Sequence, residues 1–172
     1  MKKILSIGLL LASLTVVAHA DPKGVSIKTS GFDGTKEVSL KPYGSSSCLN
    51  MKQTCLSVGA VWKSSLNDLV GLDLHVLRDF VIMSDLLINI DGEIIRATRV
   101  TEASDLKLTG LYKQSFQRFV IKKSDFDKLL TAQKVWFKVD RTDGSYIETY
   151  LIDNGKDTLA FKALQRFSTQ IQ

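Results

Sequence analysis

Apolar and polar residues alternate along several stretches of the chain, most clearly in residues 134–152, KVWFKVDRTDGSYIETYLI. Alternation with a period of two is typical of a β-strand that has one buried face. The Thr-Asp-Gly sequence at residues 142–144 suits a three-residue hairpin loop with Gly144 in the left-handed conformation. The stretch therefore predicts two antiparallel strands joined by this loop.

The length of the loop fixes which side chains of this hairpin share a face. A three-residue loop places Val139 opposite Ile147, whereas a two-residue loop would place it opposite Glu148 and mix apolar with charged residues. The three-residue loop is therefore favoured, and its mostly apolar face also pairs Val135 with Leu151 and Phe137 with Thr149. The other face pairs Trp136 with Tyr150, Lys138 with Glu148 as an ion pair, and Asp140 with Tyr146.

Several other short strands are indicated. In residues 86–98, LLINIDGEIIRAT, the Asp91-Gly92 pair suits a two-residue type I′ turn that sets Ile88 against Ile95 and Leu86 against Ala97. Further strands are predicted at residues 25–29, 37–40, 55–63 and 117–123. Residues 64–82 fit both a helix face and a strand, and we interpret them as a helical turn at residues 65–69 followed by a strand.

Two helices accompany the strands. Residues 124–132, SDFDKLLTA, have Ser124 as a candidate N-cap, and residues 157–172 have Asp157 in the same position. The second segment is amphipathic, with apolar residues at helical spacing: Ala160, Ala163, Leu164, Phe167 and Ile171. The pattern predicts a mainly β fold of the α+β class. It consists of an antiparallel sheet, sandwich-like or a partly open barrel, with a short internal helix and a C-terminal amphipathic helix.

The first twenty residues have the three parts of a secretory signal peptide. Lys2 and Lys3 precede an apolar run at residues 4–17, and Ala18-His19-Ala20 forms a small-x-small cleavage site. The run is shorter than the roughly 20 residues that span a bilayer, and we expect no transmembrane segment after cleavage. We therefore expect residues 1–20 to be a signal peptide and residues 21–172 to be one exported globular domain, periplasmic or secreted.

Composition narrows the class of partner. The 172 residues are 44% hydrophobic with two prolines, as expected of a globular chain. The net charge is +5, and removal of Lys2 and Lys3 leaves 21 basic and 18 acidic residues, or +3. So mild a charge, without a basic run and on an exported chain, argues against nucleic acid as a partner.

The two cysteines, Cys48 and Cys55, are expected to form a disulfide, since paired thiols oxidise in exported proteins. Their spacing differs from the C-x-x-C redox motif. A structural zinc site would need two more ligands, and His75 is the one histidine that remains after cleavage. The sequence therefore predicts a loop closed by a disulfide, with no metal and no cofactor.

Catalytic motifs are incomplete. Asp73 and His75 share a face of a strand and form half of a general-base arrangement, but no nucleophile accompanies them. Ser104 and Lys107 match S-x-x-K without its companion elements. Asn89, Asp91 and Glu93 offer oxygen ligands for calcium without the EF-hand pattern. Phosphate-binding glycine motifs are absent from the sequence, which argues against a nucleotide enzyme.

Aromatic and basic residues form a candidate binding surface: Trp136, Tyr146, Tyr150, Arg118 and Lys122. Such a surface suits an envelope protein or peptide, or an anionic envelope polymer. In the competing interpretation Trp136 is buried, which we expect because a soluble monomer rarely exposes Trp beside two Tyr. The predicted function is an exported binding or accessory protein of the cell envelope, such as an inhibitor or immunity protein. The alternative is a hydrolase of an envelope polymer or peptide, centred on Asp73 and His75.

If residues 1–20 are a signal peptide, the exported protein begins at Asp21. We also expect Cys48 and Cys55 to resist alkylation until a reductant is added. Intact-mass measurement of the exported protein, alkylated before and after reduction, checks both expectations. Two alkylated cysteines without reductant would contradict the disulfide.

Overall fold

The computed structural model describes residues 22–101, 104–109 and 112–171. Eleven strands within these ranges form one antiparallel sheet. The strands are β1 (Val25–Thr29), β2 (Lys36–Gly44), β3 (Leu56–Lys63), β4 (Leu69–Leu77), β5 (Met83–Ile90), β6 (Glu93–Arg99), β7 (Asp105–Thr109), β8 (Tyr112–Lys122), β9 (Lys134–Arg141), β10 (Tyr146–Asp153) and β11 (Lys156–Asp157). Two α-helices, α1 (Lys123–Thr131) and α2 (Leu159–Ser168), and two 3-10 turns, η1 (Ser46–Leu49) and η2 (Ser64–Leu66), accompany them.

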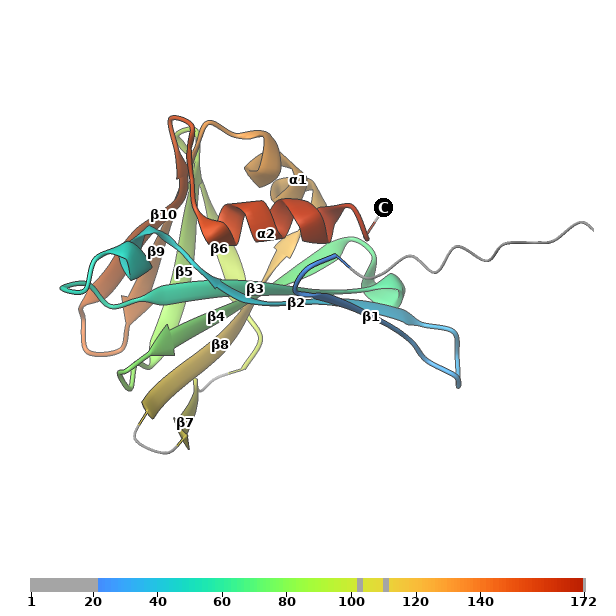
Figure 1. Ribbon diagram of the computed structural model, residues 1–172, viewed down its shortest axis with the longest axis horizontal. Helices are drawn as coiled ribbons and strands as arrows, with labels where there is room; N and C mark the ends of the chain where they lie inside the picture. Colours follow the sequence, from blue (N-terminus) through green and yellow to red (C-terminus); the bar gives the residue numbers. More distant parts are fainter. Residues whose placement is uncertain (1–21, 102–103, 110–111, 172) are drawn as a thin grey trace, which may run out of the picture.

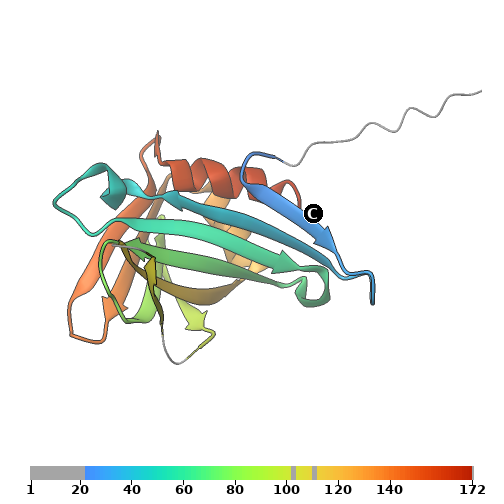
Figure 2. The ribbon, with the colours of Figure 1, turned by 60° about the horizontal axis from the view of Figure 1, so that its bottom comes forward.

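The sheet curls into a half-barrel, and both helices pack against its inner side (Figures 1 and 2). The strand order is β1-β2-β3-β4-β8-β6-β5-β9-β10-β11, with β7 paired to β8 outside this path. Helix α2 packs against β2 and β3 near one end of the order and against β10 near the other. The predicted mainly β fold with an internal and a C-terminal helix is confirmed, in its partly open barrel form.

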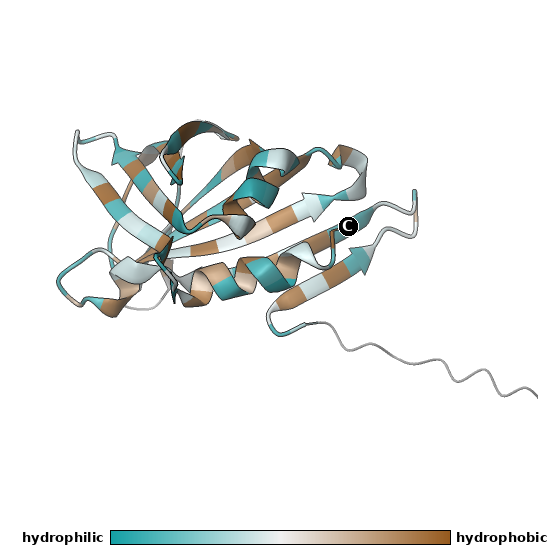
Figure 3. Cartoon of the chain, turned by 90° about the horizontal axis from the view of Figure 1, so that it is seen from above, coloured by the Kyte–Doolittle hydropathy of each residue, from teal (hydrophilic) through white to brown (hydrophobic). Residues whose placement is uncertain are grey.

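The core lies between the curled sheet and the helices. Apolar and polar residues alternate along several strands (Figure 3), and β8 and β9, for example, bury every second side chain over most of their length. All five residues of the predicted apolar stripe on the last helix are buried. Phe126 of α1 meets Phe167 of α2 edge to face, with ring centroids 5.9 Å apart. Burying such a side chain contributes about 1.5–3 kcal/mol, so the two helices are fixed to each other as well as to the sheet.

The C-terminal hairpin has the predicted loop and, from the loop to Trp136, the predicted register. Gly144 has a φ of 83°, and Val139 lies opposite Ile147 and Trp136 opposite Tyr150. Beyond Tyr150 a bulge shifts the register, so that Val135 pairs with Ile152 and not with Leu151 as predicted. The Leu151 carbonyl accepts hydrogen bonds from the backbone N–H and the hydroxyl of Thr158, at 2.9 and 2.7 Å. The residue at the bulge, Leu151, therefore bonds to Thr158, the residue that precedes α2.

The other predicted strands are present. Asp91 and Gly92 have φ values of 49° and 101°, as a type I′ turn requires, and Ile88 pairs with Ile95 and Leu86 with Ala97. Residues 25–29, 37–40, 55–63 and 117–123 lie in β1, β2, β3 and β8, with bounds shifted by a few residues. Residues 64–82 contain the predicted helical turn, at Ser64–Leu66, followed by β4.

Both predicted helix caps are wrong. The N-cap of α1 is Lys122, without a side-chain cap, and Ser124 lies inside the first turn. The N-cap of α2 is Thr158, whose hydroxyl accepts a hydrogen bond from the Phe161 N–H at 3.2 Å. Asp157 instead pairs with Ile152 in the short strand β11. Lys122 pairs with Leu69 of β4 and Asp157 with Ile152 of β10, so strand pairing of the backbone overrides the local capping preference at both helices. Within the described ranges, neither helix is long and apolar enough to cross a membrane.

Cys48 and Cys55 form the predicted disulfide. The loop that it closes begins at η1, which contacts the inner side of β10. The hydroxyls of Ser46 and Thr149 are 2.8 Å apart, and the Ser46 hydroxyl accepts a hydrogen bond from the Tyr150 N–H at 2.9 Å. The Ser47 N–H donates to the Thr149 hydroxyl at 3.0 Å. The connection between β2 and β3 is thus attached to the strand near the opposite end of the sheet.

Val139→Asp should unfold the domain, because Val139 is fully buried opposite Ile147 and an unpaired carboxylate there has no polar partner. Lys138→Ala is the matched control on the other face of the same strand. Its side chain is about half exposed, and exposed ion pairs contribute about 0–1 kcal/mol. Thermal unfolding followed by circular dichroism checks the pair. A folded Val139→Asp protein would contradict the assignment of the two faces.

Candidate functional site

The C-terminal hairpin presents its aromatic residues on the outer side of the half-barrel. Trp136 on β9 lies opposite Tyr150 on β10 and opposite Asn89 on β5, and Asn89 lies opposite Ile94 on β6. The rings of Trp136 and Tyr150 have centroids 5.4 Å apart and are tilted by 48°. Four neighbouring strands therefore contribute one row of outward side chains, and the predicted aromatic pair is present in it.

A second row runs beside the first, one pleat further along the strands. Leu87 on β5 lies opposite Lys138 on β9 and Arg96 on β6, and Lys138 lies opposite Glu148 on β10. A hollow of about 600 Å³ opens over the two rows. Its apolar lining comes from Leu87, Ile94 and Trp136, and its charged lining includes Lys134, Lys138 and Glu148. We call this hollow the outer-face hollow.

Trp136 is half-buried in this hollow. Trp136 is less buried than expected, because both described helices pack against the inner side of the sheet and leave the outer side of β9 uncovered. The indole nevertheless keeps part of its surface against Tyr150. It thus has a defined position and an accessible edge, which is the arrangement of an aromatic anchor for a partner.

The charges around the hollow are only partly paired. Lys138 Nζ lies 3.3 Å from Asp140 Oδ1 and 4.9 Å from the centroid of the Tyr146 ring, so the predicted ion pair with Glu148 is replaced by one along the strand. Lys134 and Glu148 have no ion pair among the described residues. Within the described ranges, Lys134 is therefore a cation and Glu148 an anion without an ion-pair partner beside the apolar lining of the hollow.

The five residues predicted to form a binding surface divide into two groups. Trp136, Tyr146 and Tyr150 lie together on the outer side of the hairpin. Arg118 and Lys122 lie on β8, which β6 and β5 separate from β9. Arg118 donates two hydrogen bonds to Asp73, at 2.6 and 2.7 Å, and this bonding raises its pKa. Lys122 is exposed at the end of β8.

Asp73 and His75 share the outer face of β4, as predicted. Both carboxylate oxygens of Asp73 are bonded to Arg118, and the His75 ring contacts the Phe116 ring at a centroid distance of 4.9 Å. The two residues line a smaller hollow of about 290 Å³ together with Lys107 and Asp105. Burial lowers the pKa of His75 below its usual 6.5, although the nearby Asp73 charge acts in the opposite direction.

A serine that the sequence did not single out lies opposite His75. Ser57 on β3 pairs in register with His75, and antiparallel partners of this kind share a face. Its hydroxyl is buried, 3.9 Å from the sulfur of Cys48 and 3.9 Å from that of Cys55. In the described part of the chain no hydrogen bond joins Ser57, His75 and Asp73 into a relay. Ser57 is therefore buried next to the disulfide, and it does not supply the hydrolase interpretation with a nucleophile bonded to His75.

The remaining candidate motifs serve local structure. Ser104 accepts a hydrogen bond from the Met83 N–H at 2.9 Å, and Lys107 pairs with Asp105 at 3.0 Å, so the two do not form a dyad. Asn89 accepts from the Gly92 N–H at 2.7 Å. The Asp91 carboxylate accepts from the N–H groups of residues 133 and 134, and Glu93 contacts Lys128. Across residues 22–101, 104–109 and 112–171, no three His, Cys, Asp or Glu residues group as metal ligands.

Sequence reasoning missed part of the outer-face hollow. Leu87, Ile94 and Lys134 belong to it only because β5 pairs with β9, and these strands are separated by β6, β7, β8 and α1 in the chain. The alternation of each strand does identify these three as outward residues. The pairing of the two hairpins is the information that the local pattern lacks.

The lowered pKa of His75 predicts a pH dependence of stability. Below pH 6.5 the unfolded chain takes up a proton at His75 that the folded chain binds less readily, so stability falls as pH decreases through this range. His75→Gln removes this contribution. Urea unfolding of both proteins between about pH 7.5 and pH 5.5 should show the wild type losing stability relative to the variant. Parallel stability profiles would contradict the assigned burial of the imidazole.

No protein-family model, curated protein or solved structure matches the chain. The outer-face hollow and the Asp73–His75 cluster are the two places in the described residues where a function can be located.

Proposed function

We propose that the chain is a small, exported, disulfide-bonded binding protein of the cell envelope that holds a partner protein or peptide in the outer-face hollow. The observation that carries the proposal is the position of Trp136, half-buried on a rigid strand beside Leu87 and Ile94. Trp residues in such partly enclosed positions are frequent hot spots of protein interfaces. An inhibitor or immunity protein is the role that such a surface suits.

The charges of the hollow favour a protein or peptide over an anionic envelope polymer. Lys134 and Glu148 are of opposite sign and neither has an ion pair among the described residues. A partner with charges of both signs can satisfy both, whereas a uniformly anionic chain meets repulsion from Glu148. The signal-like sequence of residues 1–20 and the disulfide support an exported location.

The alternative is a hydrolase centred on Asp73 and His75, and the hollow of about 290 Å³ beside them is the observation in its favour. Against it, Arg118 occupies both oxygens of Asp73, and no base–nucleophile hydrogen bond is present among the described residues. A general base must reach the proton that it removes. We therefore expect His75→Gln to retain the biological effect of the wild type, and loss of that effect in a stable variant would support the enzyme.

Affinity capture from the envelope extract of the source organism, followed by mass spectrometry, should identify the partner. Trp136→Ala should weaken its binding by roughly thirtyfold, or about 2 kcal/mol, because a hot-spot side chain is removed. Phe32→Ala is the matched control, since Phe32 is a fully exposed aromatic residue in the β1–β2 loop and outside the hollow. The affinities are measured by calorimetry. Equal affinities of the wild type and a stably folded Trp136→Ala protein would contradict the proposed site.

A further inference from the structure

A second surface lies at the end of the half-barrel near Arg141, the last residue of β9. The outer-face hollow includes Lys134, the first residue of the same strand. The second surface consists of the disulfide loop 48–55, the loop 77–82 and the first residues of β8, and we call it the loop-end surface. The two loops enclose a hollow of about 460 Å³, lined by Met51 and Lys52 from one loop and by Leu77 and Arg78 from the other. The Arg78 N–H donates to the Lys113 carbonyl at 2.8 Å, which joins the second loop to β8.

Several apolar side chains of the loop-end surface are exposed to solvent. Met51 is 97% exposed and Leu49 is 78% exposed, both within the loop that the disulfide closes. Further exposed apolar residues in the surface are Leu77, Phe80, Ile82 and Tyr112. Because exposed apolar side chains that gather in one patch typically mark an interaction site, this cluster indicates a surface that is covered in use.

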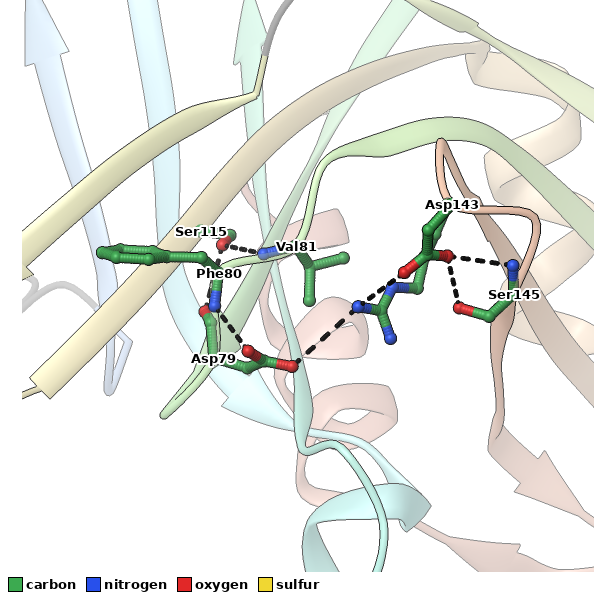
Figure 4. Close-up of polar contacts among 7 residues, drawn as sticks. Asp79, Phe80, Val81, Ser115, Asp143 and Ser145 are labelled. Carbon is green, nitrogen blue, oxygen red and sulfur yellow. Dashed lines mark hydrogen bonds and ion pairs between the residues drawn. The ribbon is translucent and has the colours of Figure 1, made fainter.

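A polar network holds the loop 77–82 in a fixed shape (Figure 4). The Ser115 hydroxyl accepts from the Val81 N–H at 2.7 Å and donates to the Asp79 carbonyl at 3.2 Å, while the Asp79 carboxylate accepts from the Phe80 N–H at 2.8 Å. Asp79 Oδ2 also lies 4.0 Å from Arg141 Nη2. The same nitrogen lies 3.1 Å from Oδ2 of Asp143, which belongs to the hairpin loop between β9 and β10. Figure 4 shows the Phe80 ring pointing away from this network. Hydrogen bonds to the backbone of residues 79–81 therefore hold Phe80 in its exposed position.

The charges of the loop-end surface are mainly positive. Lys52, Arg78 and Lys113 have no ion pair among the described residues. Lys113 Nζ lies 5.4 Å from the centroid of the Phe80 ring, so a cation and an exposed aromatic ring are presented together. Asp79, the acidic residue of the two loops, is directed toward Arg141. Free cations beside protruding apolar side chains match the chemistry of an anionic lipid surface, where headgroup phosphates attract the cations and the interface accepts the apolar groups.

We propose that the loop-end surface binds the surface of a bilayer that contains anionic phospholipid. Met51, Leu49 and Phe80 enter the boundary between headgroups and acyl chains, and Lys52, Arg78 and Lys113 contact the phosphates. The disulfide and the Ser115 network hold the apolar side chains outward, so that binding does not have to reorder the two loops. This surface shares no lining residue with the outer-face hollow, but Gln53 and Thr54 of the disulfide loop line a small hollow together with Glu148. Binding to a membrane would therefore place a protein held in the outer-face hollow next to that membrane.

The test is sedimentation of the processed protein with vesicles of phosphatidylcholine containing roughly one-quarter phosphatidylglycerol, and with pure phosphatidylcholine vesicles. We expect binding to the anionic vesicles, weakened by salt. Met51→Asp and Phe80→Asp should each reduce it by about tenfold, and Lys52→Glu should reduce it and its dependence on salt. Phe32→Asp is the matched control, since Phe32 is equally exposed in the β1–β2 loop, outside the loop-end surface. It should bind like the wild type.

No binding to the anionic vesicles overturns the proposal. It is also overturned if Phe32→Asp loses as much binding as Met51→Asp, or if the charge variant loses binding while Met51→Asp and Phe80→Asp do not. Met51 is almost fully exposed, so Met51→Asp should fold even if Phe80→Asp does not. Circular dichroism checks the folding of both variants. Trp136→Ala should bind vesicles like the wild type, so failure here is distinguishable from failure of the outer-face hollow.

Discussion

The packing of α2 across the opening of the half-barrel is the interaction on which the rest of the structure depends. A curled sheet that does not close has an apolar inner face and two ends that must be held in place. The helix contacts β2, β3 and β10, and so it joins strands that lie near opposite ends of the strand order. Ala160 and Ala163 are both buried in this contact, and their small side chains let the helix approach closely. The sheet keeps its curvature because this helix fills it.

The same arrangement frees the outer side of the sheet. Since the core is completed by the two helices on the inner side, residues on the outer side of β5, β9 and β10 are not needed to build it. Trp136 there is half-buried, and Lys134 and Glu148 have no ion pair among the residues that the structure describes. On the outer side of β4 and β8, in contrast, Asp73 and Arg118 satisfy each other across the strands. The charges on the outer side of β4 and β8 are thus paired with each other. Those of Lys134 and Glu148 on the outer side of β9 and β10 are not paired among the described residues.

The sequence predicts most of the local structure and little of what joins distant parts. Both hairpin turns follow from Asp91-Gly92 and from Thr142-Asp143-Gly144, because turn geometry and alternation are set by neighbouring residues. The bulge after Tyr150 and the cap at Thr158 arise from one contact between β10 and the start of α2, which no local pattern contains.

The candidate site divides in the same way. The pairing of Trp136 with Tyr150 is local to one hairpin and was predictable. The separation of Arg118 from Trp136, and the cover that the disulfide provides for Ser57, depend on the order of strands in the sheet. Likewise, exposure of Met51 and Phe80 is a property of the assembled loops, and their apolar side chains alone would favour burial.

The attachment of η1 to β10 has a consequence for when the fold is completed. Ser46 and Ser47 contact Thr149 and Tyr150, and the neighbouring Cys48 closes the loop that follows. With reduced thiols that loop regains conformational freedom, and this freedom lowers the probability that the serines meet β10. Oxidation of two sulfur atoms on one loop therefore strengthens a contact between opposite ends of the sheet. The contact between η1 and β10 is therefore favoured where the surroundings keep the two thiols oxidised.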